Sequence, residues 1–131
     1  MYNEYSGFFK SQRDKYFKKI ASNHFKNSNL VIDIGCGQGD FLTQAKELGI
    51  NAEGIDDKDF WINHCIKKGL KAKKGSIFEL PYDNNSMDGI FLQSVLEHVD
   101  AVKSMKEITR VIKNDGVVAI SCPTPEKHFW D

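Results

Sequence analysis

A glycine-rich segment, Asp33-Ile34-Gly35-Cys36-Gly37-Gln38-Gly39, follows the first apolar run of the chain. Glycines at this spacing let the backbone turn tightly and bring its N–H groups close to a ligand, with no Cβ in the way. The carboxylate of Asp33 beside this turn suits a ligand that carries an ammonium and a sulfonium better than a ligand that carries phosphates. The alternative is a turn whose glycines only allow a helix to pack against a strand.

Dinucleotide-binding folds also use a glycine-rich turn, but one position argues against such a fold here. The dinucleotide fingerprint has its third glycine three residues after the second, and this chain has Asp40 at that place. Its carboxylate would lie at a helix N-terminus, where a pyrophosphate should bind, and the two anions would repel each other. The sequence therefore disfavours an NAD-dependent oxidoreductase.

A second carboxylate, Asp56, ends the segment Glu53-Gly54-Ile55-Asp56, about 20 residues after the glycines. In nucleoside-binding α/β folds, a carboxylate at this distance accepts hydrogen bonds from ribose hydroxyls. The alternative role is a helix N-cap, because a helix follows directly. We predict that Asp56 is the ligand and that Asp57 or Asp59 is the cap.

These residues lie between strand and helix patterns that alternate along the chain. Patterns typical of strands occur at residues 30–34, 52–55, 87–92 and 117–120, and residues 70–74 are a candidate for a further strand at the edge of the sheet. Helical spacing occurs at residues 8–25, 41–48, 61–66 and 101–112, with Gly49 and Gly69 expected to end the second and third helices and residues 114–116 expected to form a turn. The alternation predicts an α/β fold, a Rossmann-like open parallel sheet of about five strands with helices on both faces and an N-terminal helix preceding it. Ligands bind beyond the carboxyl ends of such strands, where the carboxylates above fall.

Composition limits the function classes. A chain of 131 residues is long enough for one core, and its 18 Lys and Arg balance 18 Asp and Glu, so charge gives no support for a nucleic-acid partner. No signal peptide is recognisable, and no apolar run approaches the roughly 20 residues that span a bilayer, so no membrane association is predicted. The cysteines Cys36, Cys65 and Cys122 are widely spaced and lack metal-type pairing. They predict reduced thiols in a cytoplasmic protein without a metal site.

Four ordered blocks of the sequence resemble the class I S-adenosylmethionine-dependent methyltransferases, in particular their type 11/12-like domain. Residues 31–39 (VIDIGCGQG) are similar to motif I of that family, and residues 54–56 (GID) to its acidic ribose-binding position. The remaining similarity lies in a central block, 75–82 (GSIFELPY), 86–90 (SMDGI) and 94–99 (SVLEHV), and in the last helix and turn, 107–116. The resemblance covers about residues 30–123 in the family's order.

The resemblance implies S-adenosyl-L-methionine as cofactor and S-adenosyl-L-homocysteine as product. Position by position, it implies that the turn containing Asp33 and Cys36 binds the cofactor. In this turn Gly35, Gly37 and Gly39 would contact the methionine half of the cofactor. It implies Asp56 on the ribose, Asp57 beside the adenine, Ser76 and Ile77 in the adenine pocket, and Gln93 near the methyl group. The family commonly has Asp where this chain has Ser76, so the hydrogen bond there is neutral and the affinity is expected to be lower.

The chemistry that the resemblance implies is an in-line displacement of a methyl group from sulfonium to an acceptor, which we expect to be a small molecule or a sugar-type compound. Because the donor is already activated, the protein mainly positions the reactants and excludes water, and a base is optional. His98, the only histidine in a predicted strand-end loop, could take a proton from a hydroxyl acceptor. Its alternative role is a helix-start residue that holds the loop. A catalytically silent S-adenosylmethionine-binding module is the alternative function.

Three regions are expected along the chain. Residues 1–28 would form an N-terminal helical segment that could act as a lid, residues 29–123 the S-adenosylmethionine-binding Rossmann-like core, and residues 124–131 a tail leading to a missing substrate-binding region. The family's sheet has seven strands and ends in an antiparallel pair, so this chain is expected to lack the C-terminal strands. The strand at 117–120 would then be an exposed edge, through which a homodimer could form.

Overall fold

The structure, a computed structural model, describes residues 4–122 of the chain. In chain order its elements are α1 (Glu4–His24), β1 (Val31–Ile34), α2 (Asp40–Glu47), β2 (Ala52–Asp56), α3 (Asp59–Lys67), β3 (Ala72–Lys74), β4 (Met87–Gln93), the 3₁₀ turn η1 (Leu96–His98), α4 (Ala101–Val111) and β5 (Ile112–Ser121). None of the helices in this range is both long and apolar enough to cross a bilayer.

The five strands form one sheet in the order β3-β2-β1-β4-β5, and every neighbouring pair is parallel. The chain first adds β2 and β3 on one side of β1 and then adds β4 and β5 on the other side. The carboxyl ends of β1 and β4 are therefore the topological switch point, where open α/β sheets bind ligands. The predicted Rossmann-like architecture is confirmed.

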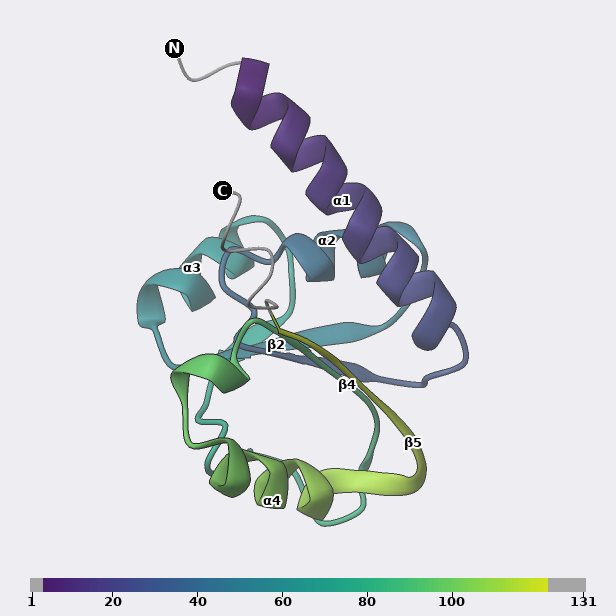
Figure 1. Cartoon of the computed structure of the whole chain (residues 1–131), viewed down its shortest axis with the longest axis vertical. Helices are drawn as coiled ribbons and strands as arrows, with labels where there is room; N and C mark the ends of the chain where they lie inside the picture. Colours follow the sequence, from purple (N-terminus) through teal and green to yellow (C-terminus); the bar gives the residue numbers. More distant parts are fainter. Residues whose placement is uncertain (1–3, 123–131) are drawn as a thin grey trace.

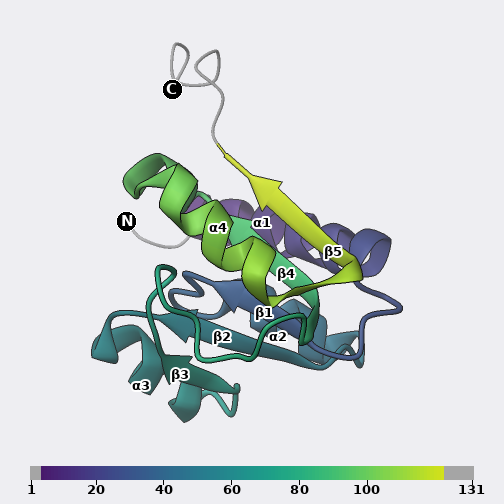
Figure 2. The ribbon, with the colours of Figure 1, turned by 90° about the horizontal axis from the view of Figure 1, so that it is seen from below.

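Helices cover both faces of the sheet. α1, α2 and α3 lie on one face and α4 lies on the other (Figures 1 and 2). Because side chains alternate along a strand, Ile32 and Ile34 face α4, whereas Val31 faces α1 and α2. The same alternation turns Asp33 toward the α1 and α2 face, into an otherwise apolar layer.

A cluster of aromatic rings fastens α1 to the sheet. Phe41 of α2 stacks on Phe91 of β4 with ring centroids 4.5 Å apart, and Phe17 of α1 meets Phe91 edge-on at 6.0 Å. Phe25, directly after α1, meets Phe41 edge-on at 6.0 Å. Each such pair contributes about 0.5–1.5 kcal/mol beyond the burial of its surface. The N-terminal half of α1 instead extends beyond the sheet, and Phe8 and Phe9 there are exposed (Figure 1).

The ends of the helices agree with the sequence prediction at two places and differ at a third. Gly49 and Gly69 follow the C-caps of α2 and α3 with φ of 74° and 76°, a conformation that glycine adopts without strain. The prediction that Asp57 or Asp59 caps α3 is wrong, because the N-cap is Lys58 and no side chain caps it. The backbone N–H of Lys58 donates to Asp56 instead, at 3.0 Å, so that carboxylate already satisfies the turn.

The fifth strand is longer than predicted. The prediction that a turn at residues 114–116 separates α4 from β5 is wrong, because α4 passes directly into β5 at Ile112. Ile112 pairs with Met87 and Val117 with Gly89, so the intervening residues bulge out of the ladder opposite β4. Beyond the bulge β5 runs along the edge of the sheet, as expected, and Val117 and Ile120 are partly exposed there.

Candidate functional site

Two pockets lie beyond the carboxyl ends of the strands, and Gly35 lines both. The first, here the Asp56 pocket, is lined by Ile34, Gly35, Ile55, Asp56, Asp57, Gly75, Ser76, Ile77, Phe78, Val95 and Val99. The second, here the Asp33 pocket, is lined by Phe17, Asp33, Gly35, Cys36, Gly37, Gln38, Asp40, Phe41, Phe91 and Gln93. The two pockets together include every predicted cofactor residue except Gly39.

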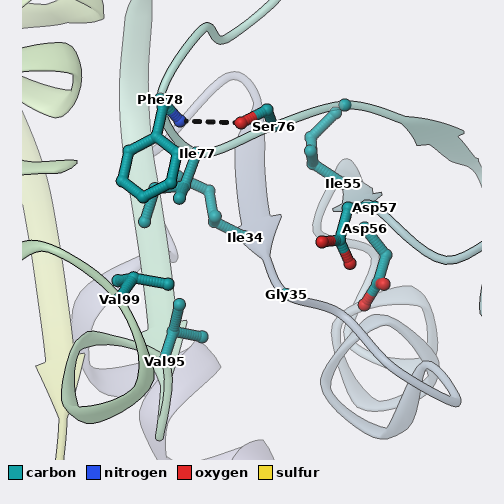
Figure 3. Close-up of a pocket in the computed structure, with 11 residues that line it drawn as sticks. Ile34, Gly35, Ile55, Asp56, Asp57, Ser76, Ile77, Phe78, Val95 and Val99 are labelled. Carbon is teal, nitrogen blue, oxygen red and sulfur yellow. Dashed lines mark hydrogen bonds between the residues drawn. The ribbon is translucent and has the colours of Figure 1, made fainter.

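The Asp56 pocket is an apolar space with an acidic end (Figure 3). Ile77 and the valines Val95 and Val99 supply aliphatic walls, while Asp56 and Asp57 stand at the end of β2. Ser76 already accepts a hydrogen bond from the backbone N–H of Phe78 at 3.1 Å, and its own hydroxyl proton is left for another partner. This arrangement suits a flat apolar group that is joined to a hydroxyl-bearing one.

Asp56 connects the glycine-rich loop to the loop after β2. It is buried, and its Oδ2 accepts a hydrogen bond from the Gly37 N–H at 3.1 Å while its Oδ1 accepts one from Lys58 at 3.0 Å. A carboxylate offers about four acceptor positions, so each oxygen keeps capacity for a ligand hydroxyl. Asp57, by contrast, is exposed at the rim.

The Asp33 pocket contains a buried carboxyl group. Asp33 is 3% exposed, and no residue in the described part of the chain forms a hydrogen bond with its carboxyl group. Burial raises the pKa of this carboxyl well above its ordinary value, and the nearby charges of Asp56 and then Asp40 raise it further. Asp33 and Asp40 line this pocket and Asp56 lies close to it, and three neighbouring carboxyl groups make a site that favours a cation.

The third carboxylate of this group, Asp40, has partners. Its Oδ2 lies 2.9 Å from Nε of Arg13 on α1 and accepts a hydrogen bond from the Gln38 amide at 2.7 Å. The charge of Asp40 is therefore partly balanced, which weakens the repulsion that we expected between this residue and a pyrophosphate. Arg13 lies 27 positions away from Asp40 in the sequence, and no pattern in the sequence pointed to it.

The three glycines of the loop have different roles. Gly35 has φ of 74°, and a Cβ there would come within 2.7 Å of Val95 Cγ2. Gly37 has φ of 52°, and a Cβ there would meet no protein atom within 4 Å, so its free space faces the pocket. Gly39 lies outside both pockets, and a Cβ there would come within 2.6 Å of Leu70 Cδ1. For Gly39 the geometry favours the alternative role, close packing of α2 against its neighbours.

The two loop-side cysteines are thiols. Cys36 lines the Asp33 pocket, and Cys65 of α3 donates a hydrogen bond to the Gly37 carbonyl at 3.3 Å. Burial raises the pKa of both thiols. They therefore support the loop as neutral groups and carry no thiolate that could act as a nucleophile.

His98 lines neither pocket. It is part of η1, its side chain is 74% exposed, and its Nε2 lies 3.7 Å from the Glu97 carboxylate. The helix start that was its alternative role is provided by Asp100, whose carboxylate caps α4 by accepting the Lys103 N–H at 3.1 Å. Its role as a base remains a prediction.

Sequence reasoning missed the apolar and aromatic parts of the site. Phe17 reaches the Asp33 pocket from α1, and Val95, Val99 and Phe78 line the Asp56 pocket. The valines stand in a block that the family resemblance already covered, so their place at a strand end was a usable signal. Phe17 carried no such signal, because its spacing in a helix only indicated burial.

Known proteins resemble this chain in sequence and in fold. The sequence profile of a family described as a methyltransferase domain matches residues 32–120. The demethylmenaquinone methyltransferase of Lactobacillus johnsonii is 32% identical over 120 residues, which cover 82% of this chain and 48% of that protein. The sterol 24-C-methyltransferase of Pneumocystis carinii is 28% identical, with 86% of this chain and 35% of that protein covered.

Among solved structures, an S-adenosylmethionine-dependent methyltransferase from Archaeoglobus fulgidus superimposes with a TM-score of 0.74 at 26% identity, covering 93% of this chain and 60% of that one. The chain spans about half or less of the length of these two curated relatives. The match to the family profile extends over most of the chain and includes both pockets apart from Phe17. The chain belongs to the S-adenosylmethionine-dependent methyltransferase family.

Proposed function

We propose that this chain is the cofactor-binding core of a methyltransferase that transfers a methyl group from S-adenosylmethionine to a small-molecule acceptor. The observation that carries the proposal is Asp33, a buried carboxyl group without a hydrogen-bond partner among the described residues, beside two further carboxylates. Burying such a group without a partner costs folding free energy, whereas a cationic ligand would supply the partner. S-adenosylmethionine carries an ammonium and a sulfonium, so the residues present fit this cofactor.

The same fit extends to the nucleoside half. We assign the ribose to Asp56, whose oxygens keep free acceptor positions, and the adenine to the aliphatic walls formed by Ile77, Val95 and Val99. Asp57 and Ser76 would then meet the edge of the base. Gly37, where no protein atom lies near the position of a Cβ, would let the backbone approach the methionine half, and Gln93 would stand near the methyl group.

When bound, the cofactor supplies a methyl group already activated by its sulfonium. The residues of the chain have the remaining tasks of binding, orientation and exclusion of water. The sulfur of the donor is a cationic sulfonium, whereas the sulfur of the product is a neutral thioether, so the carboxylates of the Asp33 pocket favour the donor. The rings of Phe17, Phe41 and Phe91 keep one side of this pocket apolar. The His98 side chain is too exposed to be held in one orientation by the protein. The proposal therefore does not include His98 as a base that takes a proton from the acceptor.

The relatives support a small molecule as the acceptor class. The names of the two curated relatives specify a demethylmenaquinone and a sterol, and neither is a macromolecule or a sugar. We keep the small-molecule class and leave the sugar-type acceptor as a prediction from the sequence. We also propose a reducing, cytoplasmic location, which is supported by the proximity of Cys36 and Cys65 as free thiols.

Calorimetry with S-adenosylhomocysteine and with NAD tests the cofactor assignment. We expect micromolar binding of S-adenosylhomocysteine and none of NAD, because the Asp33 pocket offers carboxylates where NAD needs partners for a pyrophosphate. Micromolar binding of NAD without binding of S-adenosylhomocysteine would falsify the proposal. If S-adenosylmethionine binds but a screen of small-molecule acceptors yields no methylated product, the silent binding module is the better description.

A further inference from the structure

A hydrogen-bonded cluster joins α1 to the carboxyl ends of β4 and β5. The hydroxyl of Tyr16 lies 3.1 Å from Oε1 of Gln93 and 2.8 Å from Oγ of Ser121. These residues are 77 and 105 positions away from Tyr16 in the sequence. A phenol has a single proton and an amide oxygen can only accept, so Tyr16 donates to Gln93 and has an acceptor position for the Ser121 hydroxyl.

The carboxamide of Gln93 is held at both ends. While Oε1 accepts from Tyr16, Nε2 donates to Oγ of Ser94 at 3.2 Å. Ser94 has φ of 55°, which is unusual for a residue other than glycine, and its N–H donates to the Ser121 carbonyl at 2.7 Å. A strained residue at the end of a central strand persists where its surroundings hold it, and such positions cluster at functional sites.

Fastening of α1 does not require this hydroxyl. Phe17, Ala21 and Phe25 are buried and already attach the helix to the sheet, whereas Tyr16 is 37% exposed. Its immediate neighbour Phe17 lines the Asp33 pocket, as does Gln93. The hydroxyl therefore acts on the side chain of Gln93 at the pocket rim more than on the packing of the helix.

We infer that Tyr16 is a positioning residue, which holds the Gln93 carboxamide in one orientation over the Asp33 pocket and thereby makes α1 part of the site for the methionine half. The inference rests on the proposed function. It concerns only the Asp33 pocket. Among the described residues, no hydrogen bond joins the Tyr16 side chain to a residue that lines the Asp56 pocket. Ligands that fill one pocket or both should therefore respond differently to its loss.

The test compares S-adenosylhomocysteine, which would fill both pockets, with adenosine, which would fill only the Asp56 pocket. In Tyr16→Phe the ring remains and the hydroxyl is lost, so Gln93 must be ordered when the ligand binds. We expect binding of S-adenosylhomocysteine to weaken by about 3- to 10-fold, and binding of adenosine to stay within about 2-fold of wild type. Tyr82→Phe is the matched control, because it removes the same hydroxyl from a residue that lines neither pocket.

A double-mutant cycle identifies the route of the effect. If Tyr16 acts through Gln93, then Tyr16→Phe should add almost nothing to the loss that Gln93→Ala causes by itself. Three outcomes would overturn the inference and leave the proposed function standing. They are an equal loss of affinity for both ligands, full additivity of Tyr16→Phe with Gln93→Ala, and unchanged binding of S-adenosylhomocysteine. Failure of the wild-type protein to bind either ligand would instead overturn the proposed function on which the inference rests.

Discussion

At the scale of single residues, folding and ligand binding favour opposite charge states of Asp33. A charged carboxylate is costly to bury, so burial raises the pKa of Asp33 and favours its protonated form, whereas a cationic ligand would favour the carboxylate. The folded protein holds this proton over a pH range in which the unfolded chain has already lost it. Stability contributed by this group is thus lost as the pH rises above the ordinary carboxyl value of 3.8.

Asp33→Asn removes this pH-dependent cost, since an amide does not titrate. At pH 7 the variant should melt at a higher temperature than the wild type, and a gain of about 1 kcal/mol would raise Tm by roughly 3–6 °C. At pH 3.5 the two proteins should melt alike. Its affinity for S-adenosylhomocysteine should fall, because the ammonium loses its anionic partner. Calorimetry at both pH values measures Tm, and a lower Tm of the variant at pH 7 would contradict the account.

Asp56→Ala addresses the nucleoside half. Loss of a charged hydrogen-bond acceptor should weaken binding of S-adenosylhomocysteine by about 1.5–3 kcal/mol, or roughly 10- to 150-fold. Asp59→Ala is a suitable control, because Asp59 is exposed on α3, lines neither pocket and pairs with Lys74 at the surface. Titration calorimetry on both variants gives the comparison. An unchanged dissociation constant for Asp56→Ala would leave Asp56 with only its structural role in the loops.

Residues at strand ends were predictable from the sequence, and residues that reach the site from a distant helix were not. Asp33 and Asp56 each stand near the end of a predicted strand, so their place at the carboxyl edge of the sheet followed from the fold class. Tyr16 and Arg13 contact the site only because α1 crosses the sheet beside α2. That crossing is a tertiary relation, and periodicity within α1 carries no information about it.

At the scale of elements, the glycine-rich loop separates ligand binding from packing. Gly37→Ala and Gly39→Ala both force a side chain into a left-handed backbone conformation, at about 1–2 kcal/mol each. Gly37→Ala should cost little more stability but should weaken binding of S-adenosylhomocysteine, because its Cβ points into open pocket space. Gly39→Ala should lower stability by about 2–4 kcal/mol, because its Cβ meets Leu70. Urea unfolding and titration calorimetry on both variants test this division, and equal losses in both would contradict it.

The sequence predicted the elements well where apolar period and glycine agreed, as in α2 with Gly49 at its end. It missed the start of β5, because Asn114-Asp115-Gly116 has the composition of a turn. In the structure these residues form a bulge that remains within the strand, since pairing of Ile112 with Met87 already begins the ladder. Local composition cannot distinguish a turn that ends an element from a bulge that bends one.

At the scale of the whole molecule, β5 determines how the 131-residue chain should associate. It spans Ile112–Ser121 at the edge of the sheet, and among the described residues it pairs on one side only, with β4. Its outer N–H and C=O groups form a template for another strand. Two identical edges related by a two-fold axis would pair antiparallel, so that the two five-stranded sheets become one continuous sheet.

We therefore expect the 131-residue chain to form a dimer at high micromolar concentration. Ile120→Lys should shift the association to higher concentration, since Ile120 is 43% exposed on β5 and a lysine on an edge strand opposes pairing with a second edge. Phe60→Lys is the matched control, because Phe60 is 69% exposed on α3, which packs beside β3 at the opposite edge. It removes as large an exposed apolar group and adds the same charge, so a general effect of solubility would appear in both variants. Sedimentation velocity over a concentration series measures the association. A wild-type chain that stays monomeric throughout, or equal dissociation by both substitutions, would rule out pairing through β5.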